Sequence, residues 1–226
     1  EQKRWSDVER IMTGIRPEQR TAPMQSLAAQ SALRGKFSAV LQRATAGDPT
    51  GARQLMLQLY QSSRMGSKAA GELASELATA GQLDLAYQLV ELDLMQGLDE
   101  KSGDYLAHVA VLNQSGRSKD ARLLLSELML RSDLTMDDRK SLASLQHGLA
   151  VREADQLREA GQMALAYDVL AAHLRESPDD ETLLLAMGRL YQSGDKTSEA
   201  DQIYNYILKL NPASQDALSG AVDTAL

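Results

Sequence analysis

Histidines and clustered carboxylates are the residues in this sequence that could bind a metal ion or transfer protons. His108, His147 and His173 lie far apart, and none has a partner at i+4, the spacing that places two ligands on one helix face. The acidic run at residues 179–181 stands at a predicted helix start, where carboxylates stabilise the positive end of the helix dipole. Cysteine is absent, and the glycines stand at predicted helix ends instead of in a phosphate-binding loop. We therefore expect no catalytic site, no cofactor and no metal, so that function must reside in the surface that the helices build.

The composition is that of a folded protein with an acidic surface. Of the 226 residues, 43% are hydrophobic and 24% are charged, and the formal net charge is −7. A net negative charge repels phosphate backbones, which disfavours nucleic acid as a partner. No apolar run approaches the roughly 20 residues that a membrane-spanning helix needs. No signal peptide is recognisable and the sequence begins with Glu1, so we expect a processed product or a piece of a longer protein.

Five copies of one pattern run along the chain, each with a glycine followed five or six positions later by an alanine. These alanines are Ala52, Ala86, Ala121, Ala166 and Ala200. Three of the four steps between successive alanines are roughly 34 residues, and the third step is longer, at about 45. Prolines follow the last two copies at equivalent positions, Pro178 and Pro212. A period of about 34 residues indicates an array of repeated helix pairs.

Each copy has the features of two antiparallel helices joined by a tight turn. The glycine falls just past the first helix, where a left-handed residue closes the last turn without steric cost. In the first copy Asp48 is placed to cap the second helix and Pro49 to occupy its first position. The alanine falls where the second helix crosses the first, so we expect Ala121, Ala166 and Ala200 to be fully buried. The prolines then end the second helices.

The repeat resembles the tetratricopeptide repeat, a helix–turn–helix unit of about 34 residues. The last copy carries the pattern of that family at Met187, Gly188, Tyr191, Ala200, Tyr204 and Pro212. The resemblance implies an all-α fold, a right-handed tetratricopeptide-repeat superhelical solenoid of antiparallel helix pairs from about residue 26 to the end. We expect an N-terminal helix or partial repeat over 1–25, repeats one to three over 26–136, a lengthened helix that could act as a joint over 137–160, and the remaining repeats with a terminal helix over 161–226.

The hydrophobic periodicity predicts an array of helices and no strand. The expected ranges are 26–45, 49–63, 67–80, 83–96, 100–115, 118–131, 137–160, 163–176, 180–193, 197–210 and 214–225. The longer step between Ala121 and Ala166 is explained by a first helix that is extended by about three turns. Because each repeat contacts only its neighbours, an irregular step is where the solenoid is expected to bend.

Both ends of the sequence have the pattern of partial repeats. The N-terminal residues form a short amphipathic helix with Trp5, Val8 and Ile11 or Met12, which Pro17 ends. The C-terminal residues have the pattern of a first helix without its second helix, which leaves apolar side chains unpaired. These side chains are Leu218, Val222 and Leu226. A capping helix and a longer array are both consistent with this pattern.

The candidate binding surface is the face that the first helices share, because in the family that the repeat resembles the non-packing positions of these helices contact extended partners. The alignment assigns to this face Glu72, Glu76, Thr79, Asp104, Gln114, Arg152, Gln156, Glu159, Arg189 and Gln192. Ala107, Val111 and Leu185 are expected on the same face. The set is neutral to acidic and lacks the Lys/Asn cluster with which chaperone-binding members hold a C-terminal carboxylate. Tyr105 and Tyr191 are the nearest candidates for stacking on a sugar.

A narrower resemblance links residues 185–226 to the tetratricopeptide array of the exporter component of bacterial cellulose synthase. It is carried by GRLYQSG at 188–194, Ala200, IYNYIL at 203–208 and GAVDTAL at 220–226. That family is an outer-membrane exporter of exopolysaccharide with a long periplasmic solenoid. The resemblance implies a periplasmic, non-catalytic scaffold between the synthase and the outer-membrane pore. Its implied partners are proteins, namely the synthase complex or other periplasmic components, with weak contact to the glucan.

Two other functions remain open from the sequence. The chain could be a cytosolic tetratricopeptide adaptor that binds a peptide in its groove, or the repeat region of a larger enzyme whose catalytic domain lies elsewhere. The absence of cysteine fits the cytosol and the periplasm equally well. Because solenoids are reused for many partners, the fold alone does not choose among the three functions.

Overall fold

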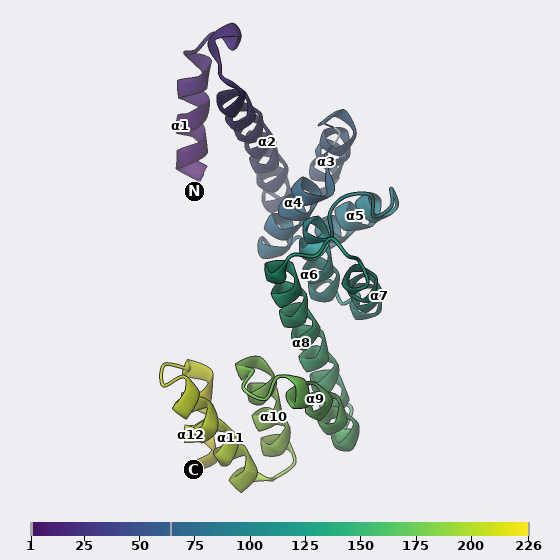
Figure 1. Cartoon of the computed structure of the whole chain (residues 1–226), viewed down its shortest axis with the longest axis vertical. Coiled ribbons are helices and arrows are strands. Elements are labelled where there is room, and N and C mark those ends of the chain that lie inside the picture. The colour runs from purple at the N-terminus through teal and green to yellow at the C-terminus, as the bar shows by residue number, and fades with distance from the viewer. Residues whose placement is uncertain (1, 64, 226) are drawn as a thin grey trace. The chain divides into compact units, whose positions relative to one another are not determined.

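The fold is all-α over the residues that the structure describes. The computed structural model describes residues 2–63 and 65–225 and contains no strand there (Figure 1). The α-helices are α1 (Gln2–Thr13), α2 (Ala22–Thr45), α3 (Pro49–Ser63), α4 (Ser67–Thr79), α5 (Leu83–Leu94), α6 (Leu106–Gln114), α7 (Ser118–Met129), α8 (Met136–Glu159), α9 (Met163–Glu176), α10 (Glu181–Ser193), α11 (Thr197–Leu210) and α12 (Gln215–Ala225). Two 3-10 turns, η1 (Pro17–Gln19) and η2 (Ser102–Tyr105), precede α2 and α6. The predicted all-α repeat of helix pairs is confirmed, and the hand of the superhelix stays a prediction.

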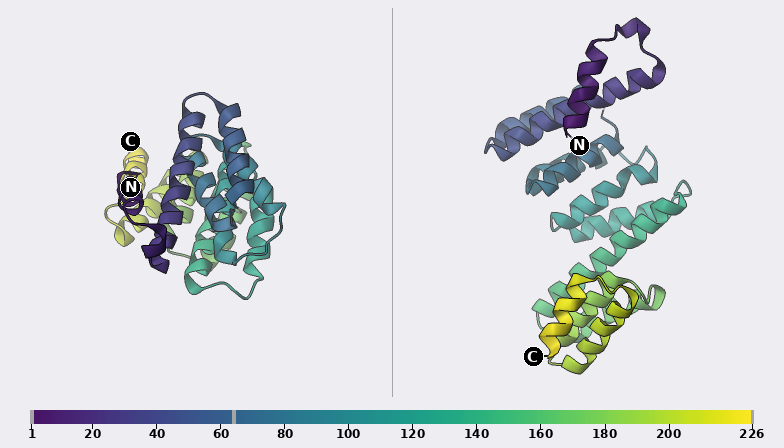
Figure 2. Two further views of the ribbon diagram at one scale, coloured as in Figure 1. Left: turned by 90° about the horizontal axis from the view of Figure 1, so that it is seen from above. Right: turned by 90° about the vertical axis from the view of Figure 1, so that its left-hand side faces the viewer.

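The chain divides into two compact units. Unit 1 is Glu1–Ala121 with Arg131–Leu134, and unit 2 is Arg122–Leu130 with Thr135–Leu226. In unit 1 the first helices α2, α4 and α6 are neighbours, and the second helices α3 and α5 pack on them. In unit 2 the helices α8, α10 and α12 take the role of first helices, and α9 and α11 pack on them as second helices (Figure 2).

The five repeat alanines are among the most deeply buried residues of the described structure. Each of them, including the three for which burial was predicted, has no exposed surface. The predicted start of the second helix in the first repeat is confirmed as well: α3 begins at Pro49, and the Asp48 carboxylate accepts a hydrogen bond of 2.8 Å from Gly51 N. Helices α9 and α11 end just before Pro178 and Pro212. The alanines therefore set the register in which each helix pair packs.

The turn inside each helix pair uses a left-handed residue at a fixed distance from the buried alanine. Four glycines that lie five positions before their alanines have φ between 74° and 84°. In the last repeat the prediction of a left-handed Gly194 is wrong, because Gly194 has a φ of −97° and Asp195 has a φ of 57°. Gly194 lies six positions before Ala200, so the packing of the alanine places the left-handed position on Asp195, a residue type that tolerates it.

The third first helix begins later than predicted. It starts as the turn η2, and α6 itself has only nine residues. Arg131 donates hydrogen bonds of 2.7 Å to the backbone carbonyls of Leu98 and Glu100, so these carbonyls do not accept helical hydrogen bonds. Asp133 accepts hydrogen bonds from the backbone N and the Oγ of Ser102 and thereby caps the turn. A segment that lies one repeat further along the chain thus determines where this helix starts.

Helix α8 is the lengthened first helix that the long step between Ala121 and Ala166 predicts. It has 24 residues, and it starts at a capping box between Thr135 and Asp138. The Thr135 hydroxyl accepts a hydrogen bond from Asp138 N, and the Asp138 carboxylate accepts one from Thr135 N. The cap explains why the helix begins there, well before the position at which α4, η2 and α10 start relative to their buried alanines.

The contacts of the loop after each second helix show which residues of α8 are the inserted turns. In the last four repeats this loop reaches back to one position of the first helix, which lies at the same distance before the buried alanine each time. The hydrogen-bonded pairs are Glu100 with Ser67, Asp133 with Ser102, Asp180 with His147 and Asn211 with Glu181. In three repeats this position begins the helical element, but in α8 it is preceded by residues 136–146. These eleven residues are therefore the insertion, and a bend of the solenoid at this helix stays a prediction.

The terminal helices α1 and α12 have the features of partial repeats. Leu218 and Val222 of α12 are 42% and 60% exposed, as predicted, and Leu226 lies outside the described residues. Helix α1 packs on α2, and Met12 is the buried member of its predicted apolar set. The side chain of Trp5 lies outside the described part of the structure.

Candidate functional site

In unit 1, two predicted site residues form ion pairs with a neighbouring first helix. Arg34 of α2 binds Glu72 of α4, with 2.8 Å between Arg34 Nη2 and Glu72 Oε2, and its Nη1 binds Glu76 one turn further along α4. The three side chains are 31–39% exposed. Thr79, at the end of α4, is exposed and donates a hydrogen bond to the carbonyl of Ser75. The structure thus brings Glu72 and Glu76 together on an open face.

Helix α6 contributes fewer residues to this face than predicted. Asp104 is half-buried in η2, and Gln114 is exposed at the end of α6. Val111 is only 1% exposed, so its assignment to the open face is wrong. Ala107 is half-buried against Gly71 of α4. The contact is close, because a Cβ atom added to Gly71 would lie 2.9 Å from the Cβ atom of Ala107. The reason is that α6 packs on both α4 and α5, which leaves only a narrow stripe of α6 open.

In unit 2, the predicted residues lie on α8 and α10. Gln156 and Glu159 are exposed on α8, and Arg152 is half-buried there. Arg189 of α10 pairs with Asp155 of α8 at 3.3 Å. Asp155 also pairs with Arg158 of the same helix. Leu185 is half-buried, because it packs against the apolar cluster that includes Tyr204 and Ile207 of α11. Gln192 turns to the second helix, because its Oε1 accepts a hydrogen bond of 3.1 Å from the Tyr204 hydroxyl.

The first-helix faces of both units share one kind of chemistry. In each unit an arginine of one first helix pairs with a carboxylate of a neighbouring first helix, and exposed amides or carboxylates flank the pair. Ion pairs that remain open to water contribute little to stability, at most about 1 kcal/mol. Such groups are able to exchange their partners for those of another protein at low cost. These surfaces are therefore suited to polar contact with a protein.

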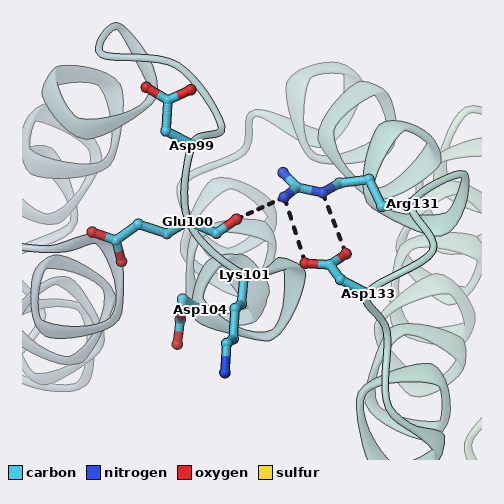
Figure 3. A pocket seen from close by; sticks show the side chains of 6 residues that line it. All are labelled: Asp99, Glu100, Lys101, Asp104, Arg131 and Asp133. Carbon is cyan, nitrogen blue, oxygen red and sulfur yellow. Dashed lines mark hydrogen bonds and ion pairs between the residues drawn. The ribbon is translucent and has the colours of Figure 1, made fainter.

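A polar recess of about 500 Å³ lies in unit 1 beside η2 (Figure 3). It is lined by Asp99, Glu100, Lys101, Asp104, Arg131 and Asp133. Only one of these, Asp104, belongs to the predicted site. All six lining residues carry a charged group, so the chemistry of the recess suits ions and polar side chains.

Much of the lining of the recess fixes the loops of unit 1. Figure 3 shows the Arg131 guanidinium between the carbonyl of Glu100 and the carboxylate of Asp133. Hydrogen bonds from the side chain and backbone of Ser102, together with the charge of Arg131, lower the pKa of Asp133 to about 2. The Glu100 carboxylate accepts a hydrogen bond of 3.0 Å from Ser67 N. The residues of the recess therefore mainly hold the loops of unit 1 together. The sequence signal for the recess is a set of polar residues whose partners lie nearly one repeat further along the chain.

A buried polar network that the sequence analysis did not predict joins the helices of unit 1. The Asp93 carboxylate accepts a hydrogen bond of 2.7 Å from the Tyr60 hydroxyl and lies 2.9 Å from His108 Nε2. Burial alone would raise the pKa of Asp93, but hydrogen bonds from His108, Tyr60 and Ser67 lower it below its ordinary value. Asp93 and His108 are 3% and 0% exposed. A substrate cannot reach them, so the network serves packing.

The other two histidines lie in unit 2. His147 Nδ1 is 2.8 Å from Asp180, which also caps α10 through Leu183 N, and the His173 ring stands against that of His147. Among the described residues, no group of three or more histidines and carboxylates is placed to hold a metal ion. In the same part of the chain no helix combines the length and the apolar character that crossing a membrane requires.

The two candidate tyrosines have different surroundings. Tyr105 is 1% exposed, and its hydroxyl is bonded to Glu100 N and to the carbonyl of Gly97. The assignment of Tyr105 as a sugar platform is therefore wrong, because the late start of α6 draws the residue into the loop. Tyr191 is half-buried, and its ring faces the exposed ring of Tyr167.

Almost the whole chain is similar to one group of known proteins. It is 26% identical over 98% of its length to cellulose synthase operon protein C of Pseudomonas fluorescens, and 25% identical over 96% to a protein of the same name from Komagataeibacter xylinus. Another Komagataeibacter xylinus protein of that name is 35% identical over 42% of the chain. The resemblance predicted from residues 185–226 is thereby confirmed and extends well beyond them.

The relatives are much longer than this chain. The chain spans 17% of the length of each of the first two. No protein-family model matches it.

Proposed function

We propose that this chain is part of a non-catalytic periplasmic scaffold that acts in the synthesis and export of cellulose, as a segment of an outer-membrane protein. The observation that carries the proposal is similarity over 98% of the chain to a protein named for the cellulose synthase operon. The similarity runs through both units, so it concerns the repeat array as a whole.

The helix-pair array supports a role in holding proteins together. Its first helices present charged and amide side chains whose ion pairs are open to water, such as Arg34 with Glu72 and Arg189 with Asp155. Repeat arrays of this kind offer extended surfaces to other chains. We infer that the partners are the synthase complex or another periplasmic component, and that the glucan itself is bound weakly.

The placement of the titratable groups supports the absence of catalysis in this segment. The buried chain of tyrosine, carboxylate and imidazole in unit 1, Tyr60–Asp93–His108, is closed to substrate. A general acid or base must come within hydrogen-bond reach of the group that reacts. If the chain were the repeat region of a larger enzyme, these buried groups would be equally out of reach of a substrate. The activity of that enzyme would have to reside in another part of it.

The proposal is tested by changing the charge of one first-helix face in the full-length protein from acidic to basic. Gln156→Lys combined with Glu159→Lys should weaken partner binding about tenfold, since these exposed positions bear no part of the core. The measurement is the cellulose secreted by a producing bacterium whose own copy is replaced. The matched control is Asp168→Lys with Gln202→Lys, two exposed positions on second helices.

The first variant should secrete much less cellulose at an unchanged level of protein, and the control should secrete the normal amount. Normal secretion by both variants would contradict the assignment of this face. Loss of secretion by the control alone would indicate that the partner binds the second helices instead.

A further inference from the structure

Two tyrosines occupy equivalent positions in the two units. Tyr87 of α5 and Tyr167 of α9 each follow directly after the buried alanine of their repeat. A cation also recurs in the next turn of each unit, because Arg117 and Lys196 both lie four positions before the buried alanine of the following repeat. Both cations are exposed. Each unit therefore carries a tyrosine and a cation at the same positions of neighbouring repeats.

The side chains of each set are in contact. In unit 1, Arg117 Cζ lies 4.6 Å from the centre of the Tyr87 ring. In unit 2, the ring centres of Tyr167 and Tyr191 are 6.3 Å apart at an interplanar angle of 52°, and Lys196 Nζ lies 5.8 Å from the centre of the Tyr191 ring. The set in unit 2 is thus an aromatic pair with a cation at one side.

The aromatic pair combines a fixed ring with an open one. Tyr191 is half-buried and packs against the apolar core of unit 2, which holds its ring in place. Tyr167 is 43% exposed. The ring of Tyr167 is therefore open to a ligand, and the ammonium group of Lys196 lies beside the other ring of the pair, that of Tyr191.

This combination matches the chemistry of a flat sugar chain. In a β-1,4-linked glucan the hydroxyl groups are equatorial, so each ring presents C–H groups on its faces and hydroxyls at its edge. A tyrosine ring offers an apolar face together with a polar tip, and it loses little conformational freedom when it is bound. A cation beside the ring is able to donate hydrogen bonds to the hydroxyls at the sugar edge.

We propose that the cluster of Tyr167, Tyr191 and Lys196 is a contact site for a β-1,4-glucan chain, and that Tyr87 with Arg117 forms a weaker site of the same kind in unit 1. The inference rests on the proposed function and names a polysaccharide-binding surface for it. The site in unit 2 has one open ring, that of Tyr167, which makes its affinity millimolar and suits a chain that must move on. The site in unit 1 is weaker because Tyr87 is half-buried and Arg117 lies over its ring.

The test is an NMR titration of the 226-residue chain with cellohexaose, followed through backbone amide signals. The signals of Tyr167, Tyr191 and Lys196 should shift with a dissociation constant in the millimolar range. Tyr167→Ala should weaken binding about fivefold, which corresponds to the loss of one aromatic contact. The matched control is Tyr206→Ala, which removes a tyrosine that is 40% exposed but bonded to Asp179 instead of facing a ring or a cation.

Maltohexaose serves as the control ligand, because its α-1,4 linkages bend the chain and prevent it from presenting a flat face. No shifts with about 10 mM cellohexaose would overturn the proposal, since binding would then be weaker than millimolar. Equal shifts with maltohexaose, or equal weakening by both tyrosine variants, would overturn it as well and leave the ring pair as a packing contact only. Unchanged signals in the rest of the spectrum show that Tyr167→Ala is folded.

This outcome is separate from that of the proposed function. If cellohexaose fails to bind but the double variant on α8 still secretes much less cellulose, the scaffold role is supported and the glucan site is refuted. If cellohexaose does not bind and the double variant on α8 secretes a normal amount of cellulose, both the glucan site and the scaffold role are refuted.

Discussion

Replacement of Asp93 by alanine should lower the free energy of unfolding of unit 1 by about 3–5 kcal/mol. The carboxylate accepts hydrogen bonds from Tyr60 and His108 inside the unit, and its removal leaves the buried His108 and the half-buried Tyr60 without this acceptor. The measurement is native-state hydrogen exchange of peptides from α3 to α6, because a repeat array does not unfold in a single two-state step. Asp99→Ala is the matched control, since Asp99 is exposed in the same unit and should stay within about 0.5 kcal/mol.

The same variant makes a prediction about pH. The pKa of Asp93 is lowered in the folded state, so its contribution to stability is complete above the ordinary aspartate pKa and is lost as the pH falls through the lowered value. The difference in exchange between the native chain and Asp93→Ala should therefore shrink at acid pH. A difference that stays constant down to the lowest pH at which the chain remains folded would show that the charge of Asp93 is not what stabilises unit 1.

Replacement of Ala200 by leucine should destabilise unit 2 by roughly 1–3 kcal/mol through overpacking. Ala200 has no exposed surface and lies in one cluster with Leu184, Tyr204 and Ile207, where the α10–α11 crossing leaves no room for a larger side chain. Gln202→Leu is the control two positions along the same helix, where the side chain faces water and the change should remain within about 0.5 kcal/mol. Equal shifts of the melting temperature for the two variants would refute the helix register.

The repeat framework was predictable because each of its signals is local. Ala166 and Ala200 mark the crossing of each helix pair, and a turn residue at a fixed distance before them marks the end of the first helix. The lengthened helix α8 follows from the same count, since the extra residues amount to about three helical turns. The exception is the last repeat, where Gly194 was predicted to be left-handed but Asp195, five positions before Ala200, takes that conformation.

The features that the sequence analysis missed depend on partners far along the chain. The late start of α6 results from Arg131 and Asp133, which lie in the loop one repeat beyond it. The burial of Val111 and Tyr105 follows from that start and from packing on two neighbouring helices. The Asp93–His108 pair is buried by contacts between different repeats, and hydrophobic periodicity carries no information on such contacts.

The predicted site residues were assigned by repeat position alone, and the structure divides them by their partners. Gln156 and Glu159 are open to a partner, and Glu72 with Glu76 is open but engaged by Arg34. Gln192 faces the hydroxyl of a neighbouring helix instead. The positions suited to a binding test are therefore those whose side chains have open surface and no role in packing.

Crosslinking in living cells tests the central claim most directly. A photoreactive amino acid is placed in the full-length protein at Gln114 or Gln156, exposed positions on first helices, and at Asp168 or Gln202, exposed positions on second helices. Irradiation of cellulose-producing cells should join the first two positions to the synthase complex or another periplasmic protein and leave the second two unlinked. Crosslinks to a cytosolic protein, or equal crosslinking from all four positions, would contradict a periplasmic scaffold that acts through its first-helix faces.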